Sequence, residues 1–239
     1  MNLYKFKPNL FIIGATKCGT TSLHNYLNAH PQIFMSEPKE PGFFLGSKIS
    51  KFKTLDSYLV LFEKGKSCKV RGESSTAYTH YPFKKGVAKR IYEFNPSAFI
   101  IYIIRDPIER TISHYWWNVR WEGERRDPYE AIIKDKFYQN VSYYALQIKQ
   151  YLKFFPKDQI KILTLESLKK DPLGILKNLF EWLGVDNTFV PPNLNQKYNP
   201  TPKVVIRSRS RFLEKVRYSK LWEKIGPLVP KSLRLFLDN

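Results

Sequence analysis

The sequence predicts an α/β fold with three layers, in which a mostly parallel central sheet lies between helices. Two observations support this prediction. Short apolar runs alternate with segments of helical periodicity, the order expected when parallel strands are joined by helices. The first run also ends in a glycine-bounded loop that leads directly into a helix. Such a strand, loop and helix unit is typical of α/β domains that bind phosphate.

The elements are expected in regular order along the chain. Apolar runs too short for helices predict strands at Leu10–Ile13, Lys69–Glu73, Ala98–Ile104 and Gln159–Leu165. Helices are expected at Thr20–Ala29, Leu55–Glu63, Phe83–Phe94, Ile108–Trp121, Pro128–Lys134, Tyr143–Phe154 and Pro172–Leu183. The chain length suits one domain over residues 1–239, which would include an irregular proline-rich loop at 190–203 and a basic helical segment at about 206–239.

The loop after the first strand has the spacing of a nucleotide-binding loop, with one change. Gly14 and Gly19 are spaced as in a Walker loop and Thr21 stands at its hydroxyl position, but Thr20 takes the place of its lysine. Lys17 lies inside the loop instead. This displaced charge favours a nucleotide that reacts near its 5′-phosphate rather than at a γ-phosphate. An exposed lysine on an ordinary glycine turn is the alternative.

A second candidate phosphate site follows the third predicted strand. Arg105 stands at the carboxyl end of that strand, where open α/β sheets bind ligands. Asp106 is a suitable N-cap for the next helix, Pro107 suits its first turn, and Ser113 follows two turns later. An arginine and a serine hydroxyl that converge there would clamp a phosphate. A surface ion pair of Arg105 with Asp106 or Glu109 is the alternative.

Taken together, these segments resemble the sulfotransferases that use 3′-phosphoadenosine 5′-phosphosulfate, of the heparan sulfate and bacterial carbohydrate type. The matching motifs are IIGATKCGTTSL and IIRDPIERTISHY, with HPQIFMSEPKEPGFF and GESSTAYTHYP between them in the family's order. The resemblance implies a P-loop NTPase-like sulfotransferase fold. It also implies donor-binding residues: Lys17, Gly19, Thr20, Thr21 and Ser22 for the 5′-phosphosulfate, Arg105 and Ser113 for the 3′-phosphate, and Lys197 or Lys203 from a late loop.

The segment 36–44 contains the candidate base. Its prolines favour a rigid extended loop, and Glu40 aligns with the glutamate that the resembled family uses to remove the acceptor's proton. A solvated pair of Lys39 and Glu40 is the alternative. The chain departs from relatives at two places. Gly42 stands where many of them carry histidine, and Ser74 stands where several heparan enzymes carry lysine.

Other side chains near these motifs have weaker assignments. Glu73 is expected to end a strand and point toward the cleft, with Ser75 or Thr76 in contact with substrate; capping of the next turn by these hydroxyls is an equal alternative. Trp117 and Trp121 share a helical face, so we expect them to pack in the core, with stacking on a sugar as the alternative.

These inferences predict an enzyme that moves a sulfuryl group from 3′-phosphoadenosine 5′-phosphosulfate to a hydroxyl, or less favourably an amine, of a glycan or small-molecule acceptor. Glu40 would take the proton, and Lys17 would stabilise charge on the leaving phosphate. No metal ion is expected to be required. Two alternatives stay open: a nucleotide-dependent kinase with an aberrant Walker loop, which would need a lysine at position 20, and a basic nucleic-acid-binding protein.

Composition bears on partners and compartment. The net charge of +19 favours anionic partners, of which the donor itself is one. Nucleic acid, an acidic glycan or an anionic membrane surface would also fit this charge, but the motifs make nucleic acid not the expected partner. Cys18 and Cys68 are too few for a disulfide framework and suit a reducing compartment, with Cys18 as a packing residue. No apolar run reaches the roughly 20 residues of a membrane span, and the first residues lack a signal peptide's apolar region. A cytoplasmic location is therefore expected, and the oligomeric state is left open.

Overall fold

The protein is built on a five-stranded sheet in which all neighbouring strands are parallel. The computed structural model describes residues 3–46, 48–194, 196 and 198 of the 239-residue chain. Its strands are β1 (Leu10–Gly14), β2 (Ile33–Met35), β3 (Val70–Ser74), β4 (Phe99–Ile104) and β5 (Ile160–Thr164). Their order across the sheet is β2-β3-β1-β4-β5. The predicted parallel sheet is confirmed.

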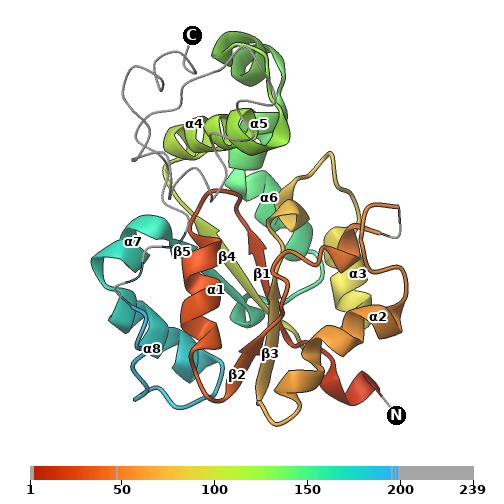
Figure 1. Cartoon of the computed structure of the whole chain (residues 1–239), viewed down its shortest axis with the longest axis vertical. Helices are drawn as coiled ribbons and strands as arrows, with labels where there is room; N and C mark the ends of the chain where they lie inside the picture. The colour runs from red at the N-terminus through yellow and green to blue at the C-terminus, as the bar shows by residue number, and fades with distance from the viewer. Residues whose placement is uncertain (1–2, 47, 195, 197, 199–239) are drawn as a thin grey trace, which may run out of the picture.

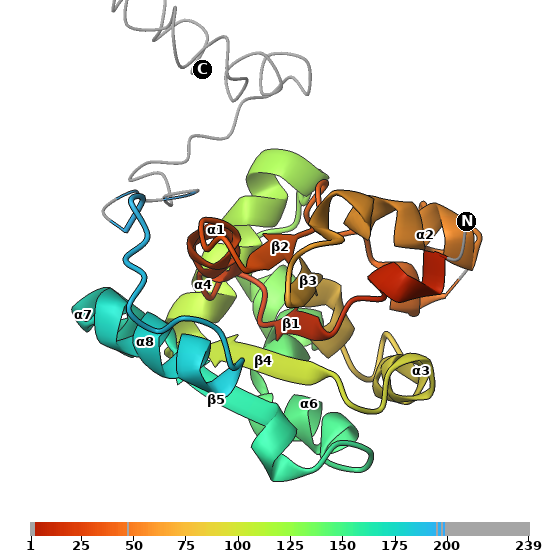
Figure 2. The same cartoon turned by 90° about the horizontal axis from the view of Figure 1, so that it is seen from below.

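The helices form a layer on each face of the sheet. They are α1 (Thr20–Asn28), α2 (Leu55–Leu59), α3 (Val87–Phe94), α4 (Pro107–Trp117), α5 (Phe137–Ser142), α6 (Tyr144–Tyr151), α7 (Leu165–Lys170) and α8 (Pro172–Trp182). Helices α1, α7 and α8 lie on one face, and α2, α3 and α6 lie on the other (Figures 1 and 2). Helices α4 and α5 lie beyond the carboxyl ends of the strands (Figure 1). The three-layer α/β architecture is therefore also confirmed.

Strand β1 is the centre of the hydrophobic core. All five of its residues are buried, because β3 and β4 flank it and helices cover both faces. Phe11 pairs in register with Glu73 on one side and with Ile100 on the other. Parallel strands end at the same edge, so β3, β1 and β4 deliver the three segments that follow them to neighbouring positions. Those segments contain most of the residues predicted to bind the donor.

Three short elements were not predicted from the sequence: β2, α5 and α7. Strand β2 has only three residues, a run too short for an apolar pattern to be distinguished. Helix α7 begins where the last strand was expected to continue, because the Thr164 hydroxyl accepts a hydrogen bond from the Ser167 N–H (3.1 Å) and caps a new helix.

The ends of several predicted helices differ from those observed. The helix expected from Phe83 begins at Val87, with Gly86 as its N-cap. Two others change type along their length, to a 3-10 helix at Val60–Gly65 and to a π-helix at Asn118–Glu122. The helix expected at Pro128–Lys134 is a π-helix at Tyr129–Lys134.

The predicted C-terminal helical segment at 206–239 lies outside the described residues, so the assignment of one domain to residues 1–239 stays a prediction. Among the helices that the structure describes, none has both the length and the apolar character needed to cross a membrane.

Candidate active site

The donor loop, residues 14–19, joins the end of β1 to the start of α1. Gly19 is the N-cap of α1 at φ 85°, and no side chain caps this helix, so its first-turn N–H groups are available to a ligand. A Cβ on Gly19 would lie 2.6 Å from Leu165 Cδ1, which leaves room for glycine alone. The Ala15 N–H donates to Ile103 O (2.6 Å) and ties the loop to β4. The loop is thus a preformed cradle at the sheet edge.

The predicted hydroxyl residues occupy the first turn of α1. Thr20 is buried, and Thr21 and Ser22 are half-buried. The structure therefore brings them together with Gly19 at the open end of the helix, as a phosphate site requires.

Lys17 has a left-handed backbone conformation (φ 67°) in the middle of the donor loop. Its Nζ lies 3.9 Å from the centroid of the Trp117 ring, a cation–π contact with the end of α4. Burial, followed by the positive charges of Arg105, Lys39 and Arg120, lowers the pKa of Lys17 to about 8. Several cations therefore share this region, and a bound anion would relieve their mutual repulsion.

Arg105 follows β4 directly and reaches back to the donor loop. Its Nη1 donates to the Lys17 carbonyl oxygen (3.3 Å), and its Nη2 forms an ion pair with Glu109. Its Nε is buried without a hydrogen-bond partner. A buried donor left unsatisfied costs about 1–3 kcal/mol, so the guanidinium has capacity for an anion. The ion pair with Glu109 considered above is present, whereas Asp106 caps α4 as predicted through the Glu109 N–H (2.8 Å).

Helix α4 is anchored by a buried arginine that the sequence did not single out. The Arg110 guanidinium donates to Ser142 Oγ (2.6 Å) and to the Tyr138 carbonyl oxygen (2.6 Å), and it lies 3.0 Å from His114 Nδ1. Ser113, the other half of the predicted phosphate clamp, is buried on the same helix. Because Arg110 connects α4 to α5 in this way, the position of Ser113 on α4 is fixed.

Glu40 lies in the loop between β2 and α2, with a left-handed backbone (φ 62°). Its N–H donates to Ser74 O (2.9 Å), its Oε2 accepts from the Thr76 N–H (2.7 Å), and its Oε1 pairs with Lys39 Nζ (2.5 Å). The side chain is 41% exposed. The Lys39–Glu40 pair considered above is thus present. Lys39 also lowers the pKa of Lys17, so the Glu40 loop lies within electrostatic reach of the donor loop.

Glu73 does not point into an open cleft, which corrects the expectation from the sequence. It is fully buried and accepts hydrogen bonds from Tyr58 Oη (2.7 Å), Ser75 Oγ (2.7 Å) and Tyr78 Oη (2.9 Å). Burial raises the pKa of Glu73 to about 7, although these hydroxyls oppose the rise. Ser75 is buried as well, so its hydroxyl has a local structural role instead of the expected contact with substrate.

Burial keeps three further side chains near the donor loop neutral. His24 Nδ1 lies 2.8 Å from Ser74 Oγ, and His80 Nε2 lies 2.8 Å from Thr16 Oγ1. Burial lowers the pKa of each histidine to about 3 and raises the pKa of Cys18 to about 11. Cys18 is therefore the packing residue that was expected. The contacts of His24 and His80 were not expected, because residues 50 or more positions apart leave no spacing signal in the sequence.

Trp121, which lies in the π-helix that follows α4, differs from expectation. The rings of Trp117 and Trp121 lie 5.9 Å apart, with the Arg120 guanidinium 4.8 Å from the Trp121 ring. Trp121 is 44% exposed, so the prediction that it packs in the core is wrong.

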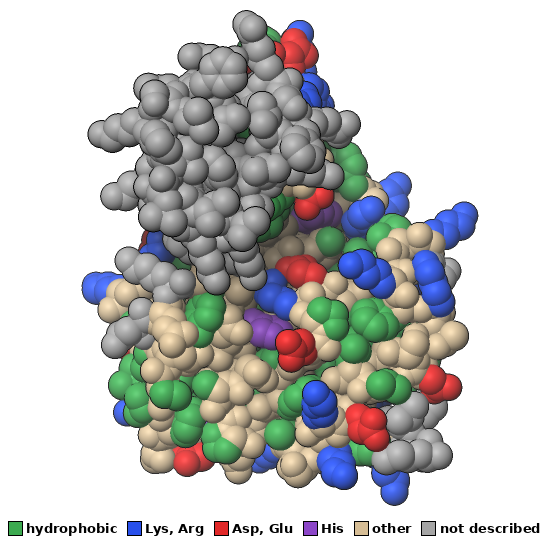
Figure 3. Space-filling view, viewed as in Figure 1, with side chains coloured by type: hydrophobic (Ala, Val, Ile, Leu, Met, Phe, Trp, Pro, Cys, Tyr) green, Lys and Arg blue, Asp and Glu red, His purple; other side chains and the backbone are tan. Residues whose placement is uncertain are grey.

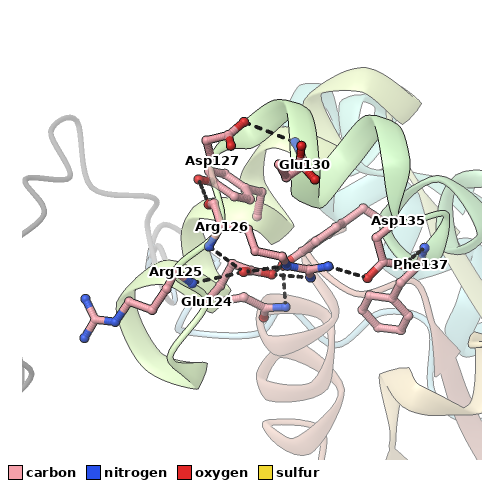
Figure 4. Close-up of polar contacts among 10 residues, drawn as sticks. Glu124, Arg125, Arg126, Asp127, Glu130, Asp135 and Phe137 are labelled. Carbon is pink, nitrogen blue, oxygen red and sulfur yellow. Dashed lines mark hydrogen bonds and ion pairs between the residues drawn. The ribbon is translucent and has the colours of Figure 1, made fainter.

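The segment after α4 is held in shape by a network of charges around Glu124 (Figure 4). Arg126 donates to both Glu124 oxygens (3.0 and 2.7 Å) and to Asp135 Oδ2 (2.8 Å), while Tyr138 Oη donates to Glu124 Oε2 (3.2 Å). The hydrogen bonds from Arg126 are the main reason that the pKa of Glu124 falls to about 2. This segment therefore has a defined shape near the candidate site.

The late loop runs beside α1. The Tyr26 hydroxyl donates to the carbonyl oxygens of Leu194 (3.2 Å) and Gln196 (3.1 Å). The two lysines predicted to reach the nucleotide from this loop, Lys197 and Lys203, lie outside the described residues.

The face of the molecule seen in Figure 3 is hollowed at its centre, and acidic, basic and histidine side chains gather around the hollow. In the part of the chain that is described, no three His, Cys, Asp or Glu side chains are grouped so that they could hold a metal ion. The polar chemistry of this region is thus that of cations, hydroxyls and carboxylates, among which Glu40 and Glu109 are exposed.

Known proteins with similar sequences carry the same domain. A family model of the sulfotransferase domain matches residues 7–232. Mouse heparan sulfate glucosamine 3-O-sulfotransferase 5 is 28% identical over 206 residues, covering 80% of this chain and 56% of that protein. The membrane-associated sulfotransferase kil1 of Dictyostelium discoideum is 30% identical over 121 residues, covering 51% of this chain and 25% of that protein. The chain thus matches about a quarter to just over half of the length of these relatives.

A solved structure extends the comparison to the fold. A sulfotransferase from Alicyclobacillus acidocaldarius has a TM-score of 0.72 and 32% identity to this chain, with coverage of 81% of this chain and 87% of that one. The resemblance inferred from the motifs is confirmed, and neither the kinase nor the nucleic-acid-binding alternative is favoured. With its sheet, its donor loop and the matched domain in agreement, the chain belongs to the sulfotransferase family.

Proposed function

We propose that this enzyme transfers a sulfuryl group from 3′-phosphoadenosine 5′-phosphosulfate to a hydroxyl of a carbohydrate. Family membership supports the reaction class, and the name of the mouse relative, a glucosamine 3-O-sulfotransferase, supports a sugar hydroxyl. A small metabolite, or an amine in place of the hydroxyl, is the less favoured acceptor. A cytoplasmic location, independence of metal and the lack of a nucleic-acid partner are predictions that accompany this proposal.

The observation that carries the proposal is the contact between Arg105 and the donor loop. Arg105 Nη1 lies 3.3 Å from Lys17 O, so the two predicted phosphate sites are adjacent. A nucleotide with separate phosphates on its 5′ and 3′ sides suits two adjacent anion sites on different elements. The unpartnered Nε of Arg105 provides a further donor that a 3′-phosphate would satisfy.

The donor-binding residues divide into two groups. In this proposal the 5′-phosphosulfate is bound by the start of α1 and the 3′-phosphate by the corner between β4 and α4. The first group is Lys17, Gly19, Thr20, Thr21 and Ser22, and the second is Arg105 and Ser113. Lys197 is a proposed additional contact from outside the described residues.

When bound, the donor supplies a sulfuryl group attached to a 5′-phosphate leaving group. Glu40 then accepts the proton of the acceptor hydroxyl while that oxygen bonds to sulfur and the bond from sulfur to the 5′-phosphate oxygen breaks. The Lys17 ammonium stabilises the negative charge left on that phosphate oxygen. The partial exposure of Glu40 supports its role, because a base must be accessible to the acceptor.

Calorimetric titration separates this proposal from the two alternatives. We expect adenosine 3′,5′-bisphosphate to bind more tightly than ATP and more tightly than duplex DNA. A kinase would prefer ATP in the presence of magnesium. A nucleic-acid-binding protein would prefer DNA, with an affinity that falls steeply as salt is added.

A further inference from the structure

Glu73 is a fully buried carboxylate whose role the proposed function does not explain. Its three hydrogen-bond partners are the hydroxyls of Tyr58, Ser75 and Tyr78. Hydroxyls compensate a buried charge less well than a cation does, so this arrangement is costly to the fold. The burial of Glu73 at this energetic cost indicates that its carboxylate has a structural role.

Two of the three hydroxyls also bind the loop that contains Glu40. Ser75 Oγ accepts from the Gly42 N–H (3.0 Å), and Tyr78 Oη accepts from the Phe44 N–H (3.1 Å). Each hydroxyl has one proton, and an ionised carboxylate can only accept. The protons of both hydroxyls therefore point at Glu73, which leaves their lone pairs directed at the two loop N–H groups. Glu73 thus orients both hydroxyls so that they accept hydrogen bonds from the Gly42 and Phe44 N–H groups.

The loop needs such support because its backbone is unusual. Glu40 has φ 62°, a conformation that residues other than glycine seldom adopt, and it persists only where surrounding contacts hold it. The Glu40 N–H is bound to Ser74 O (2.9 Å), and the Glu40 carboxylate is bound to the Thr76 N–H (2.7 Å). With the connections through Ser75 and Tyr78, the loop is attached at four points to the end of β3 and the 3-10 turn that follows it.

We propose that Glu73 is a positioning residue that fixes the loop 40–44, and with it the direction of the Glu40 carboxylate, through Ser75 and Tyr78. The part of this inference that concerns catalysis rests on the proposed role of Glu40 as the base. The part that concerns the loop does not, and it can be tested without substrate.

The first test is amide hydrogen exchange in the full chain, read by NMR at single residues at pH 8, where Glu73 is ionised. Ser75→Ala should speed exchange at Gly42, and Tyr78→Phe should speed exchange at Phe44. We expect factors of about tenfold, which correspond to the loss of one ordinary hydrogen bond. Glu73→Gln replaces one carboxylate oxygen with an NH₂ group, so either Ser75 or Tyr78 loses the acceptor that orients its proton, and at least one of the two amides should exchange faster.

Tyr58→Phe is the matched control. It removes the same kind of hydrogen bond to Glu73 but no contact with a loop amide, and it keeps the ring that stacks on Phe43 at 4.4 Å. This variant should therefore leave exchange at Gly42 and Phe44 unchanged. If Glu73→Gln left both amides protected, or if Tyr58→Phe exposed them as much as Ser75→Ala and Tyr78→Phe do, the inference would be overturned.

The second test measures turnover with the best acceptor from a panel of glycans, alcohols and phenols. Ser75→Ala should lower kcat by about tenfold, the effect of losing one hydrogen bond, with affinity for adenosine 3′,5′-bisphosphate unchanged. In a Glu40→Gln background it should cause no further loss, since it acts through Glu40. An equal loss in that background, or a parallel loss of nucleotide affinity, would overturn the catalytic part. Unchanged turnover in Glu40→Gln alone would instead refute the proposed base, while the exchange result would still decide the role of Glu73 in the loop.

Discussion

Lys17, Arg105 and Lys39 lie close enough to affect one another at the donor loop. Water screens such charges poorly where they are partly buried, so Arg105 and Lys39 make Lys17 harder to protonate. A bound anion would have the opposite effect and would raise the pKa of Lys17. We therefore expect nucleotide binding to depend on Arg105 and on the protonation of Lys17.

Arg105→Ala should weaken binding of adenosine 3′,5′-bisphosphate by about 1.5–3 kcal/mol, the range for a hydrogen bond to a charged group. The affinity for adenosine 5′-monophosphate should hardly change, because that ligand lacks the 3′-phosphate. Calorimetry with both ligands measures the difference. Glu109→Gln is the control, since it removes the ion pair and leaves the guanidinium in place. Equal losses for both ligands would refute the assigned clamp.

Nucleotide affinity should also depend on pH through Lys17. Its pKa of about 8 in the free protein means that the ammonium is charged at pH 7 and is lost as the pH rises above 8. An anion binds the charged form better, so affinity should fall by up to about tenfold per pH unit above pH 8. Titrations of adenosine 3′,5′-bisphosphate between pH 7 and 9.5 measure this slope. Lys17→Met should bind weakly with a flat profile, and a steep profile in that variant would assign the effect to another group.

Glu40→Gln keeps the shape of the side chain and removes its basicity. Turnover should fall by about 10²- to 10⁴-fold, the usual contribution of a general base, with little change in nucleotide affinity. Steady-state rates on a verified acceptor and calorimetry on the same preparation make the comparison. Near-normal turnover would show that the base lies elsewhere.

The start of α1 depends on the backbone conformation of one residue of the donor loop, Gly19. Gly19 combines a left-handed backbone with a side-chain position that Leu165 already fills. Gly19→Ala should lower the free energy of unfolding by about 1–2 kcal/mol from the backbone alone, and it should also weaken nucleotide binding because the start of α1 must shift. Gly46→Ala, at φ 98° with open space around it, should show the backbone cost without the loss of binding. Thermal unfolding and calorimetry test both variants, and unaltered binding in Gly19→Ala would contradict this role for the loop.

The elements also differ in how well the sequence predicts them. The unit of β1, donor loop and α1 and the corner from β4 to α4 were predicted because local signals specify them: apolar runs, two glycines, and an N-cap followed by proline. The surroundings of Glu73 were mispredicted because Tyr58, which helps to bury it, lies 15 residues away on another element. The shape of the segment around Glu124 was not predictable for a similar reason, since its contacts with Arg126 and Tyr138 form only in the folded chain.

At the scale of the whole molecule, the order β2-β3-β1-β4-β5 places the Glu40 loop, the donor loop and Arg105 along one edge. Strand β3, to which the Glu40 loop is attached, lies beside β1, and β4, which Arg105 follows, lies on the other side of β1. The strand order thus arranges the proposed base, the proposed leaving-group cation and the proposed 3′-phosphate clamp in sequence. The excess of 40 basic over 21 acidic residues adds a general attraction for a polyanionic donor.

Activity should survive chelation of divalent metals. In the proposed mechanism Lys17 and Arg105 provide the positive charge that magnesium provides in phosphoryl transfer, and a sulfuryl group carries less charge than a γ-phosphoryl group. Rates measured with and without EDTA at saturating donor should agree. A complete loss that magnesium restores would favour the kinase instead.

The contact of Lys17 with Trp117 links the donor loop to a chromophore. The emission of an indole responds to a charge held over its ring, and any ligand that attracts the ammonium alters that environment. Occupancy of the loop can therefore be followed by intrinsic fluorescence, with no dye and no assay of product. The chain contains five tryptophans, so a Trp117→Phe variant isolates the signal. A time-resolved record of this emission would give the rate at which the loop captures and releases its nucleotide, a quantity that equilibrium titration does not provide.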